Sequence, residues 1–262
     1  MSAAYETLAF EKNGAIARIT LNRPKAANGF NAQMMQELAA VAAGCDADRS
    51  IKAVILTGSG RFFSAGGDLK GMADAGEARG AYVKRLADNL HRATSSFARM
   101  DPPLIVAVNG VAAGGGFSLA ISGDLVIAAR SAAFTMAYTR AGLSPDGSSS
   151  YFLPRLVGLR RAQDLMFTNR TLTASEALDW GLVTEVVDDD ALQARADALA
   201  ASFVGGARGA NSNIKKLLNA TYGQSLESQM ETEGRMVAAC ANSAEGREGI
   251  DAFIAKRTPQ FP

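Results

Sequence analysis

The stretch VNGVAAGGGFSLAISGDLVIAA, residues Val108–Ala129, places three consecutive glycines between two apolar runs. The overlapping PPLIVAVNG predicts a buried strand, GGFSLAISG a short helix and DLVIAA a further strand. A glycine-rich loop that leads directly into a helix exposes backbone N–H groups at the positive end of the helix dipole. The stretch therefore predicts a strand, loop, helix and strand with a place for a developing negative charge. The alternative is that Gly114–Gly116 only let the helix pack closely on a strand.

The chain before this stretch alternates between strands and helices in the same way. ETLAFEKNGAIARITLN predicts a β-hairpin around Asn13-Gly14, because this dipeptide tolerates the positive φ angles of a tight turn. NAQMMQELAAVAAGCDAD has apolar residues at helical spacing, and KAVILTG predicts a short buried strand. A second glycine-rich loop, Phe62–Met72, precedes YVKRLADNLHRATSSFARM, which predicts a long helix.

The C-terminal part of the chain has a different pattern. AAFTM and LVTEVV predict strands, whereas RAQDLMFTN and SEALDWG predict helices. From about Asp190 to Arg257 the periodicity predicts helices only, separated by Gly205-Gly206 and by Gly223. The pattern as a whole predicts an α/β fold with an all-helical C-terminal region.

Composition excludes several classes of protein. Of the 262 residues 48% are hydrophobic and 20% charged, which favours a folded protein with a sizeable core. The formal net charge of +1 offers no field that would attract nucleic acid or an anionic membrane. Cys45 and Cys240 are expected to be free thiols. The N-terminal residues lack a signal-peptide pattern and no apolar run has membrane-spanning length, so we expect a cytoplasmic protein that does not enter membranes.

Four segments resemble one known family in order and spacing. They are ITLNRP (Ile19–Pro24), FSAGGDLKGM (Phe63–Met72), the opening stretch, and LTASEALDWGLVTEVV (Leu172–Val187). Together they resemble the crotonase, or enoyl-CoA hydratase/isomerase, superfamily. The resemblance implies a spiral of strand-strand-helix units as the catalytic core, residues 1–200, and a helical trimerisation region that also completes the active site, residues 201–262. It further implies an acyl-CoA thioester substrate, a homotrimer or hexamer, no metal, and no cofactor beyond the coenzyme A of the substrate.

The resemblance also assigns residues to the site. The two oxyanion-hole N–H groups fall on Gly67 and Gly115, where they would hold the thioester carbonyl while charge builds on its oxygen. The family positions that hold coenzyme A fall on Lys25, Ala65, Asp68, Leu69 and Lys70, with the adenine pocket at Phe253 and Lys256. For the lysines the alternative is an ordinary solvated surface position. Preference for an acyl group is expected to depend on mobile loops such as Lys70–Lys84.

One departure concerns the two catalytic glutamates of the hydratases. The matching positions hold Ser118 and Tyr138, and neither is a carboxylate that could activate water. Asp146, in AGLSPDGSSSYFLPRLVG, lies at a loop position where some isomerases and a hydrolytic dehalogenase of the family carry an aspartate. We expect Asp146 to act as the base that moves a proton along the substrate carbon chain. The alternative is that it caps a helix that starts near Gly147.

The resemblance leaves several activities open. PDGSSSYFLPRLVG and REGIDAFIAKRTPQF resemble the 1,2-epoxyphenylacetyl-CoA isomerase type, which favours an isomerase over an enoyl-CoA hydratase. His91, the only histidine, and Asp146 also align with the base and nucleophile of 4-chlorobenzoyl-CoA dehalogenase, and Tyr138 aligns with one of its aromatic pocket positions. A hydrolytic dehalogenase or thioesterase is therefore an alternative. A non-catalytic binding protein, for example for RNA, is disfavoured by the near-zero charge.

Overall fold

The N-terminal hairpin forms as predicted, with its turn one residue later. In the computed structural model, which describes residues 5–262, β1 (Leu8–Asn13) pairs antiparallel with β2 (Ile16–Leu21). Asn13 pairs with Ile16, so the turn residues are Gly14 and Ala15, and of these only Gly14 has a positive φ, 58°. A glycine at the first turn position matches the twist of the two strands without steric strain.

The large sheet has six strands in the order β1-β2-β3-β5-β7-β10 and is parallel after the hairpin. Its remaining strands are β3 (Ala53–Gly58), β5 (Leu104–Val108), β7 (Leu125–Ala129) and β10 (Glu185–Val187). Every residue of β5 is buried, and so is every residue of β3 except Gly58. These runs are apolar throughout because parallel strands with both faces covered have no solvent-facing side.

A second sheet explains the spiral arrangement of the core. It contains β4 (Phe62–Ser64), β6 (Val111–Ala113), β8 (Ala133–Thr135) and β9 (Leu172–Thr173) in that order. In the consecutive pairs β3/β4, β5/β6 and β7/β8, the first strand joins the large sheet and the second joins the small one. The chain therefore repeats a strand-strand-helix unit, as the family resemblance implied.

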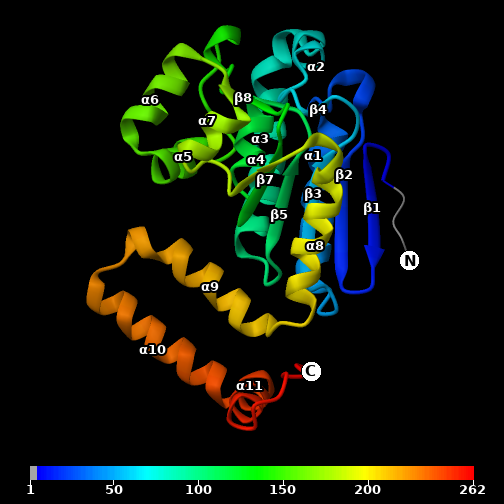
Figure 1. Cartoon of the computed structure of the whole chain (residues 1–262). Coiled ribbons are helices and arrows are strands. Elements are labelled where there is room, and N and C mark those ends of the chain that lie inside the picture. The colour runs from blue at the N-terminus through cyan, green and yellow to red at the C-terminus, as the bar shows by residue number, and fades with distance from the viewer. Residues whose placement is uncertain (1–4) are drawn as a thin grey trace.

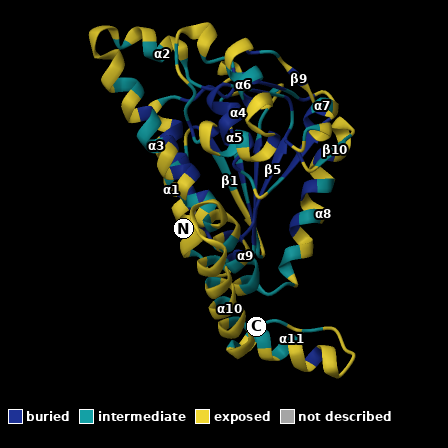
Figure 2. Cartoon of the chain, turned by 90° about the vertical axis from the view of Figure 1, so that its left-hand side faces the viewer, coloured by how far each residue is buried: buried dark blue, intermediate teal, exposed yellow. Residues whose placement is uncertain are grey.

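Helices cover both faces of the large sheet. Figure 2 shows the sheet between α8 (Leu192–Val204) on one side and α1 (Ala32–Ala47) with α3 (Arg79–Arg99) on the other. Helix α8 contacts β2, β3, β5 and β7. Helix α1 begins where predicted, because the Asn31 side chain accepts a hydrogen bond from the Met34 N–H at its N-terminus.

Shorter helices surround the glycine-rich loops. They are α2 (Leu69–Asp74), α4 (Gly115–Ala120), α5 (Ser149–Val157), α6 (Leu159–Thr168) and α7 (Ala174–Asp179). The expectation of a loop over Lys70–Lys84 is wrong, because α2, a 3-10 turn at Gly76–Ala78 and the start of α3 occupy this segment. Helices accommodate the glycines of this segment at the cost of some stability.

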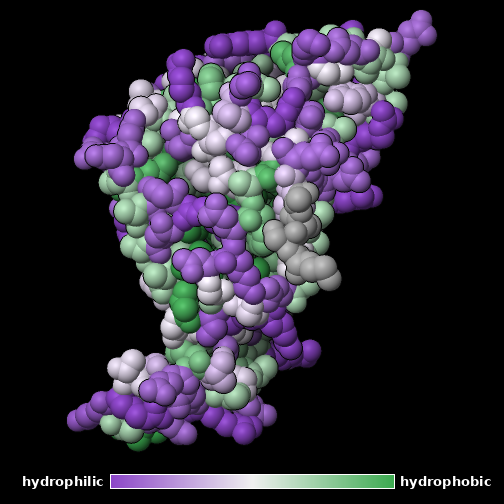
Figure 3. Space-filling view, turned by 90° about the vertical axis from the view of Figure 1, so that its right-hand side faces the viewer, coloured by the Kyte–Doolittle hydropathy of each residue, from purple (hydrophilic) through white to green (hydrophobic). Residues whose placement is uncertain are grey.

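The predicted C-terminal helices are α9 (Arg208–Ala220), α10 (Leu226–Asn242) and α11 (Ala244–Ile254). They lie below the sheets in Figure 1, and Figure 3 shows a narrow waist above the lowest part of the molecule, which holds α11. None of the helices described, from α1 to α11, is long and apolar enough to cross a membrane.

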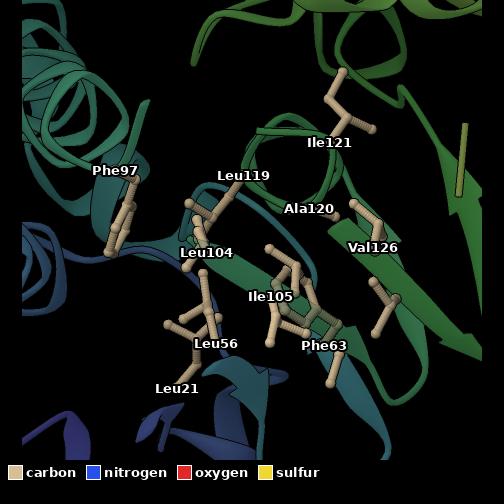
Figure 4. Close-up of a cluster of buried hydrophobic side chains, with 14 of the residues drawn as sticks. Leu21, Leu56, Phe63, Phe97, Leu104, Ile105, Leu119, Ala120, Ile121 and Val126 are labelled. Carbon is tan, nitrogen blue, oxygen red and sulfur yellow. The ribbon is translucent and has the colours of Figure 1, made fainter. Parts of the chain in front are cut away.

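Side chains from both sheets and from the helices form the hydrophobic core. Figure 4 shows Leu21, Leu56 and Ile105 of the large sheet close to Phe63 of the small sheet. Leu119 and Ala120, on the short helix that follows the glycine triplet, point into the same cluster. Burying one such leucine or phenylalanine contributes about 1.5–3 kcal/mol. The core therefore holds α4, and with it the glycine triplet, in a defined place.

Candidate active site

The first glycine-rich loop presents the Gly67 N–H away from its neighbouring chain. Phe30 and Gly67 form a parallel bridge, in which the Phe30 N–H donates to the Gly66 carbonyl (2.7 Å) and the Asp68 N–H to the Phe30 carbonyl (3.0 Å). Both bonds use groups that flank Gly67, so its own N–H faces the opposite side. Within residues 5–262 this N–H has no hydrogen-bond acceptor.

The second loop brings Gly115 next to the first. Gly115 is the first residue of α4, so its N–H has no acceptor within the helix and lies at the positive end of the helix dipole. Gly66, with φ of 84°, approaches so closely that a Cβ there would lie 2.8 Å from the Gly115 nitrogen and 2.6 Å from the Ala113 carbonyl oxygen. The two predicted donors, Gly67 and Gly115, are thus brought together at one place.

The Asp146 carboxylate contacts His91 and does not cap a helix. Its Oδ1 lies 2.6 Å from Nε2 of His91, which comes from α3. Helix α5 begins at Ser149, with Ser148 at the N-cap position, and no side chain caps it. The capping alternative is therefore wrong, although the helix starts close to Gly147 as expected. The side chain of Asp146 is free to face a ligand while it contacts His91.

The two positions that hold glutamates in hydratases form a neutral hydroxyl network. The Ser118 and Tyr138 oxygens lie 3.0 Å apart, and the Tyr138 hydroxyl donates to the Asp146 carbonyl at 3.0 Å. Burial raises the pKa of Tyr138 to about 12, so the phenol keeps its proton near neutral pH. Here the network positions the backbone of Asp146 and supplies no second carboxylate.

A cavity of about 440 Å³ joins these groups. Gly67, Gly115, Tyr138 and Asp146 line it, as do apolar side chains from α2, α3 and the segment before Asp146. These apolar residues are Leu69, Met72, Val83, Leu86, Ala87, Leu90 and Leu143. Asp146 is the only acidic residue and Lys84 the only basic one among the described residues of this lining. An apolar cavity with a few convergent polar groups is typical of a small-molecule site.

Some of the predicted substrate-binding residues lie at this cavity and others do not. Ala65 and Leu69 line it, whereas Lys25 and Lys70 are exposed and absent from its lining, and Lys70 pairs with Asp74. Asp68 instead caps α2 through the Gly71 N–H and pairs with Arg23 at 3.1 Å. Although burial acts to raise the pKa of Asp68, these hydrogen bonds hold it below its usual value. This carboxylate therefore orders the loop backbone.

The predicted adenine-pocket residues lie far from the cavity. Phe253, on α11, is 84% exposed, and Lys256 follows the end of the same helix. Figure 1 shows α11 at the opposite end of the molecule from α2 and α4, between which the glycine-rich loops meet. Within one chain these two residues do not contribute to the cavity.

Apolar side chains of α3 border the cavity, although no sequence motif marked them as site residues. Val83, Leu86, Ala87 and Leu90 recur every three or four residues, which places them on one face of the helix. This spacing predicted a helix but also fits ordinary core packing. Only the tertiary structure shows that the helix face borders a cavity.

Comparisons with known proteins identify the family. The family described as enoyl-CoA hydratase/isomerase matches residues 11–262. The 1,2-epoxyphenylacetyl-CoA isomerase of Escherichia coli is 40% identical over 250 residues, with 94% of each chain covered. The 4-chlorobenzoyl coenzyme A dehalogenase-2 of an Arthrobacter species is 32% identical over 95% of this chain and 91% of its own.

Comparison with solved structures identifies the same family. A structure described as an enoyl-CoA hydratase from a Polaromonas species superposes with a TM-score of 0.93 at 30% identity, covering 97% of this chain and 99% of that one. The fold, the two glycine-rich loops and the match along nearly the whole sequence agree. The chain belongs to the enoyl-CoA hydratase/isomerase family of the crotonase superfamily.

Proposed function

We propose that this enzyme is an acyl-CoA isomerase that shifts a double bond by proton transfer through Asp146. The observation that supports it most strongly is that one carboxylate, Asp146, serves a cavity with two free backbone donors, Gly67 and Gly115. A double-bond shift needs one base that removes a proton and returns it at another carbon. It also needs donors that stabilise the enolate formed between the two steps.

In the proposed reaction the thioester carbonyl accepts hydrogen bonds from the Gly67 and Gly115 N–H groups. The Asp146 carboxylate removes a proton from C2 of a 3-enoyl thioester, and the electron pair of that C–H bond delocalises over the enolate oxygen and the former double bond. The carboxylic acid then gives a proton to C4, which leaves the conjugated 2-enoyl thioester. Loss of one such backbone donor typically slows a reaction by roughly a hundredfold to a thousandfold.

The cavity also supports an apolar acyl group as the substrate class. Leucine, methionine, valine and alanine side chains make up most of its lining. We place the coenzyme A moiety outside the cavity, toward the exposed Lys25 and Lys70, as the family resemblance implies. The proposed steps use only groups of the chain, and coenzyme A takes part as a portion of the substrate.

Hydration is the less favoured activity, because it requires a second acidic or basic group that transfers a proton to or from the added water. The positions of the hydratase glutamates hold Ser118 and Tyr138, which are neutral and bonded to each other. Among the described residues that line the cavity, Asp146 is the only carboxylate that could activate a water molecule at the double bond.

Hydrolysis is a second candidate, favoured by the contact between His91 and Asp146. In that reaction Asp146 would attack the ring carbon that carries the chlorine, form an aryl ester and release chloride, and His91 would activate the water that hydrolyses this ester. Rapid quench of a single turnover with 4-chlorobenzoyl-CoA, followed by mass spectrometry of the peptide that contains Asp146, tests this route. An aryl ester on Asp146 would favour hydrolysis over isomerisation.

The principal test incubates the purified enzyme with 3-hexenoyl-CoA and, separately, with 2-hexenoyl-CoA. We expect the absorbance of a conjugated thioester to appear with the first substrate and no hydration of the second. Asp146→Asn should lower the isomerisation rate by roughly a hundredfold to ten-thousandfold, because it removes the base. Circular dichroism of the variant controls for folding. Normal isomerisation by Asp146→Asn, or dominant hydration by the wild type, would contradict the proposal.

A further inference from the structure

A second cavity lies on the other side of the Asp146 loop. It has a volume of about 500 Å³ and shares Pro145 and Asp146 with the first cavity. Its lining is more polar than that of the first cavity. The polar residues of this lining, besides Asp146, are His91, Thr94, Ser95, Arg99, Ser148, Ser150, Tyr151 and Asn219. Asp146 therefore borders two chambers of different chemistry, one apolar and one polar.

His91 belongs to the polar chamber alone. It lines the second cavity and is absent from the lining of the first, although its Nε2 lies 2.6 Å from Asp146 Oδ1. Half of its side chain is exposed to solvent. The imidazole thus connects Asp146 to water without reaching the place of the acyl group.

The access of Asp146 to water changes once a thioester fills the first cavity. The acyl group then excludes water from the apolar side of Asp146, so a proton on the carboxyl group leaves either toward substrate or toward the polar cavity, where His91 contacts the carboxylate. Imidazole is the side chain best suited to pass protons near neutral pH, because its two nitrogens bind and release them with similar ease. The second cavity provides room for the water that receives the proton.

We propose that His91 and the second cavity form a proton outlet for Asp146, so that the hydrogen delivered to the product comes from water and not from the substrate. This inference rests on the proposed isomerisation. Asp146 carries the proton from C2, and its O–H bond breaks as Nε2 of the neutral imidazole binds that proton. The imidazolium releases its Nδ1 proton to water. In the return direction water protonates Nδ1, and the Nε2 proton passes to Asp146, which delivers it to C4.

The test measures the source of the product hydrogen in D2O. The wild-type enzyme converts 3-hexenoyl-CoA, and mass spectrometry with NMR gives the fraction of the first-formed product that carries deuterium at C4. We expect most product molecules to be labelled. The labelled fraction is counted per turnover, so a variant that is only slower or less stable does not change it.

His91→Gln is the informative variant, because an amide can bond to the carboxylate but cannot pass a proton on. We expect the ratio of labelled to unlabelled product to fall about tenfold, as expected when a proton shuttle is lost. Arg92→Gln, at the next and also exposed position of α3, is the matched control and should label like the wild type. In His91→Ala, added imidazole should restore labelling.

A second probe separates this inference from the proposed function. Hexanoyl-CoA has no double bond to shift, yet Asp146 can exchange its C2 hydrogen with solvent by the same outlet. Equal labelling by His91→Gln and wild type, or retention of substrate hydrogen by the wild type, would overturn the outlet and leave isomerisation intact. Exchange of hexanoyl-CoA that depends on His91, without isomerisation of 3-hexenoyl-CoA, would support the outlet and overturn the isomerase. Absence of both reactions would overturn both.

Discussion

Gly66 shows how one residue controls the spacing of the proposed oxyanion hole. Its φ of 84° is unfavourable for any residue with a Cβ. A Cβ there would also lie within 2.8 Å of the Gly115 nitrogen. Gly66 therefore allows the backbones of the two loops to meet, although it supplies no donor of its own to the carbonyl.

We expect Gly66→Ala to lower kcat/KM for isomerisation by roughly a hundredfold or more, because the methyl group pushes the Gly115 N–H away from the carbonyl. Gly14→Ala is the matched control, since Gly14 also has a positive φ but no atom within 4 Å of an added Cβ. Both variants should lose about 1–2 kcal/mol of stability through backbone strain. If steady-state kinetics show equal activity for the two variants, the close approach at Gly66 has no catalytic importance.

At the scale of elements, Glu37 ties α1 to the segment that leads into β1. Its buried carboxylate accepts hydrogen bonds from the Glu6 N–H (2.8 Å), the Thr7 N–H (3.0 Å) and the Thr7 hydroxyl, and from Gln33 on its own helix (2.8 Å). Burial acts to raise the pKa of Glu37, but these donors together hold it below its ordinary value of 4.5. The charged form is therefore the one that the fold stabilises.

This carboxylate predicts a pH dependence of stability. Because the pKa of Glu37 is lower in the folded state than in the unfolded state, its contribution is present above 4.5 and is lost as the pH falls below that value. Glu37→Gln should cost about 1.5–3 kcal/mol at pH 7 and make stability less sensitive to acid. Urea unfolding at pH 7 and pH 4 measures both effects. The exposed Glu233→Gln serves as control, and an equal change in both variants would contradict the assignment.

An ion pair between the buried Lys215 and the partly exposed Asp124 fastens α9 to the core. Lys215 Nζ lies 2.8 Å from Asp124 and donates to the Phe97 carbonyl at 2.7 Å and the Pro102 carbonyl at 3.2 Å. Burial raises the pKa of Asp124 and lowers that of Lys215, so each charge depends on the other for compensation. The pair marks the point where the C-terminal helices leave the core.

We expect Lys215→Met to destabilise the protein by about 1–3 kcal/mol, because it removes the charged donor of two backbone carbonyls and the cation that pairs with Asp124. The neighbouring Lys216 is a natural control. It is about half exposed and lies 3.4 Å from Asp101, and Lys216→Met should cost less than about 1 kcal/mol. Denaturant unfolding of the two variants gives the comparison. Equal losses of stability in the two variants would show that the Lys215–Asp124 pair does not fasten α9 to the core.

At the scale of the whole molecule, the C-terminal helices expose many large apolar side chains. On α9, α10 and α11 these are Ile214, Leu218, Leu226, Met230, Val237, Ile250, Phe253 and Ile254. Apolar exposure of this extent is typical of surfaces that bind another protein. We propose that a second copy of the chain covers them, in a homotrimer or a hexamer.

Sedimentation velocity of the full chain should therefore give a mass of three or six chains. Phe253→Asp places a charge on the most exposed of these side chains and should shift the population toward smaller species. Phe167→Asp, on α6 and also largely exposed, is the control outside the C-terminal helices and should keep the assembly. A monomeric wild type, or the same mass for wild type and Phe253→Asp, would contradict the proposed role of this surface.

Local sequence patterns were sufficient to predict most of the helices and strands. The hairpin, α1, α3, β3 and β5 follow from periodicity and turn residues, because short-range packing and capping decide whether such segments form. Strands β4, β6 and β9 were missed. Each has two or three residues, too few to show a period, and they exist because the small sheet pairs them.

For the site, the family resemblance indicated Asp146, and the two glycine-rich loops were visible in the sequence itself because each loop is a short run of adjacent residues. The resemblance also indicated the absence of the hydratase glutamates. The side chains of Asp146 and His91 are in contact, although the two residues are 55 positions apart in the sequence. The local sequence suggested instead that Asp146 caps a helix. Only the tertiary structure determined the pairing of Asp146 with His91 and the second cavity. Both depend on how α3 and the Asp146 loop pack, and long-range packing leaves no periodic trace in the sequence.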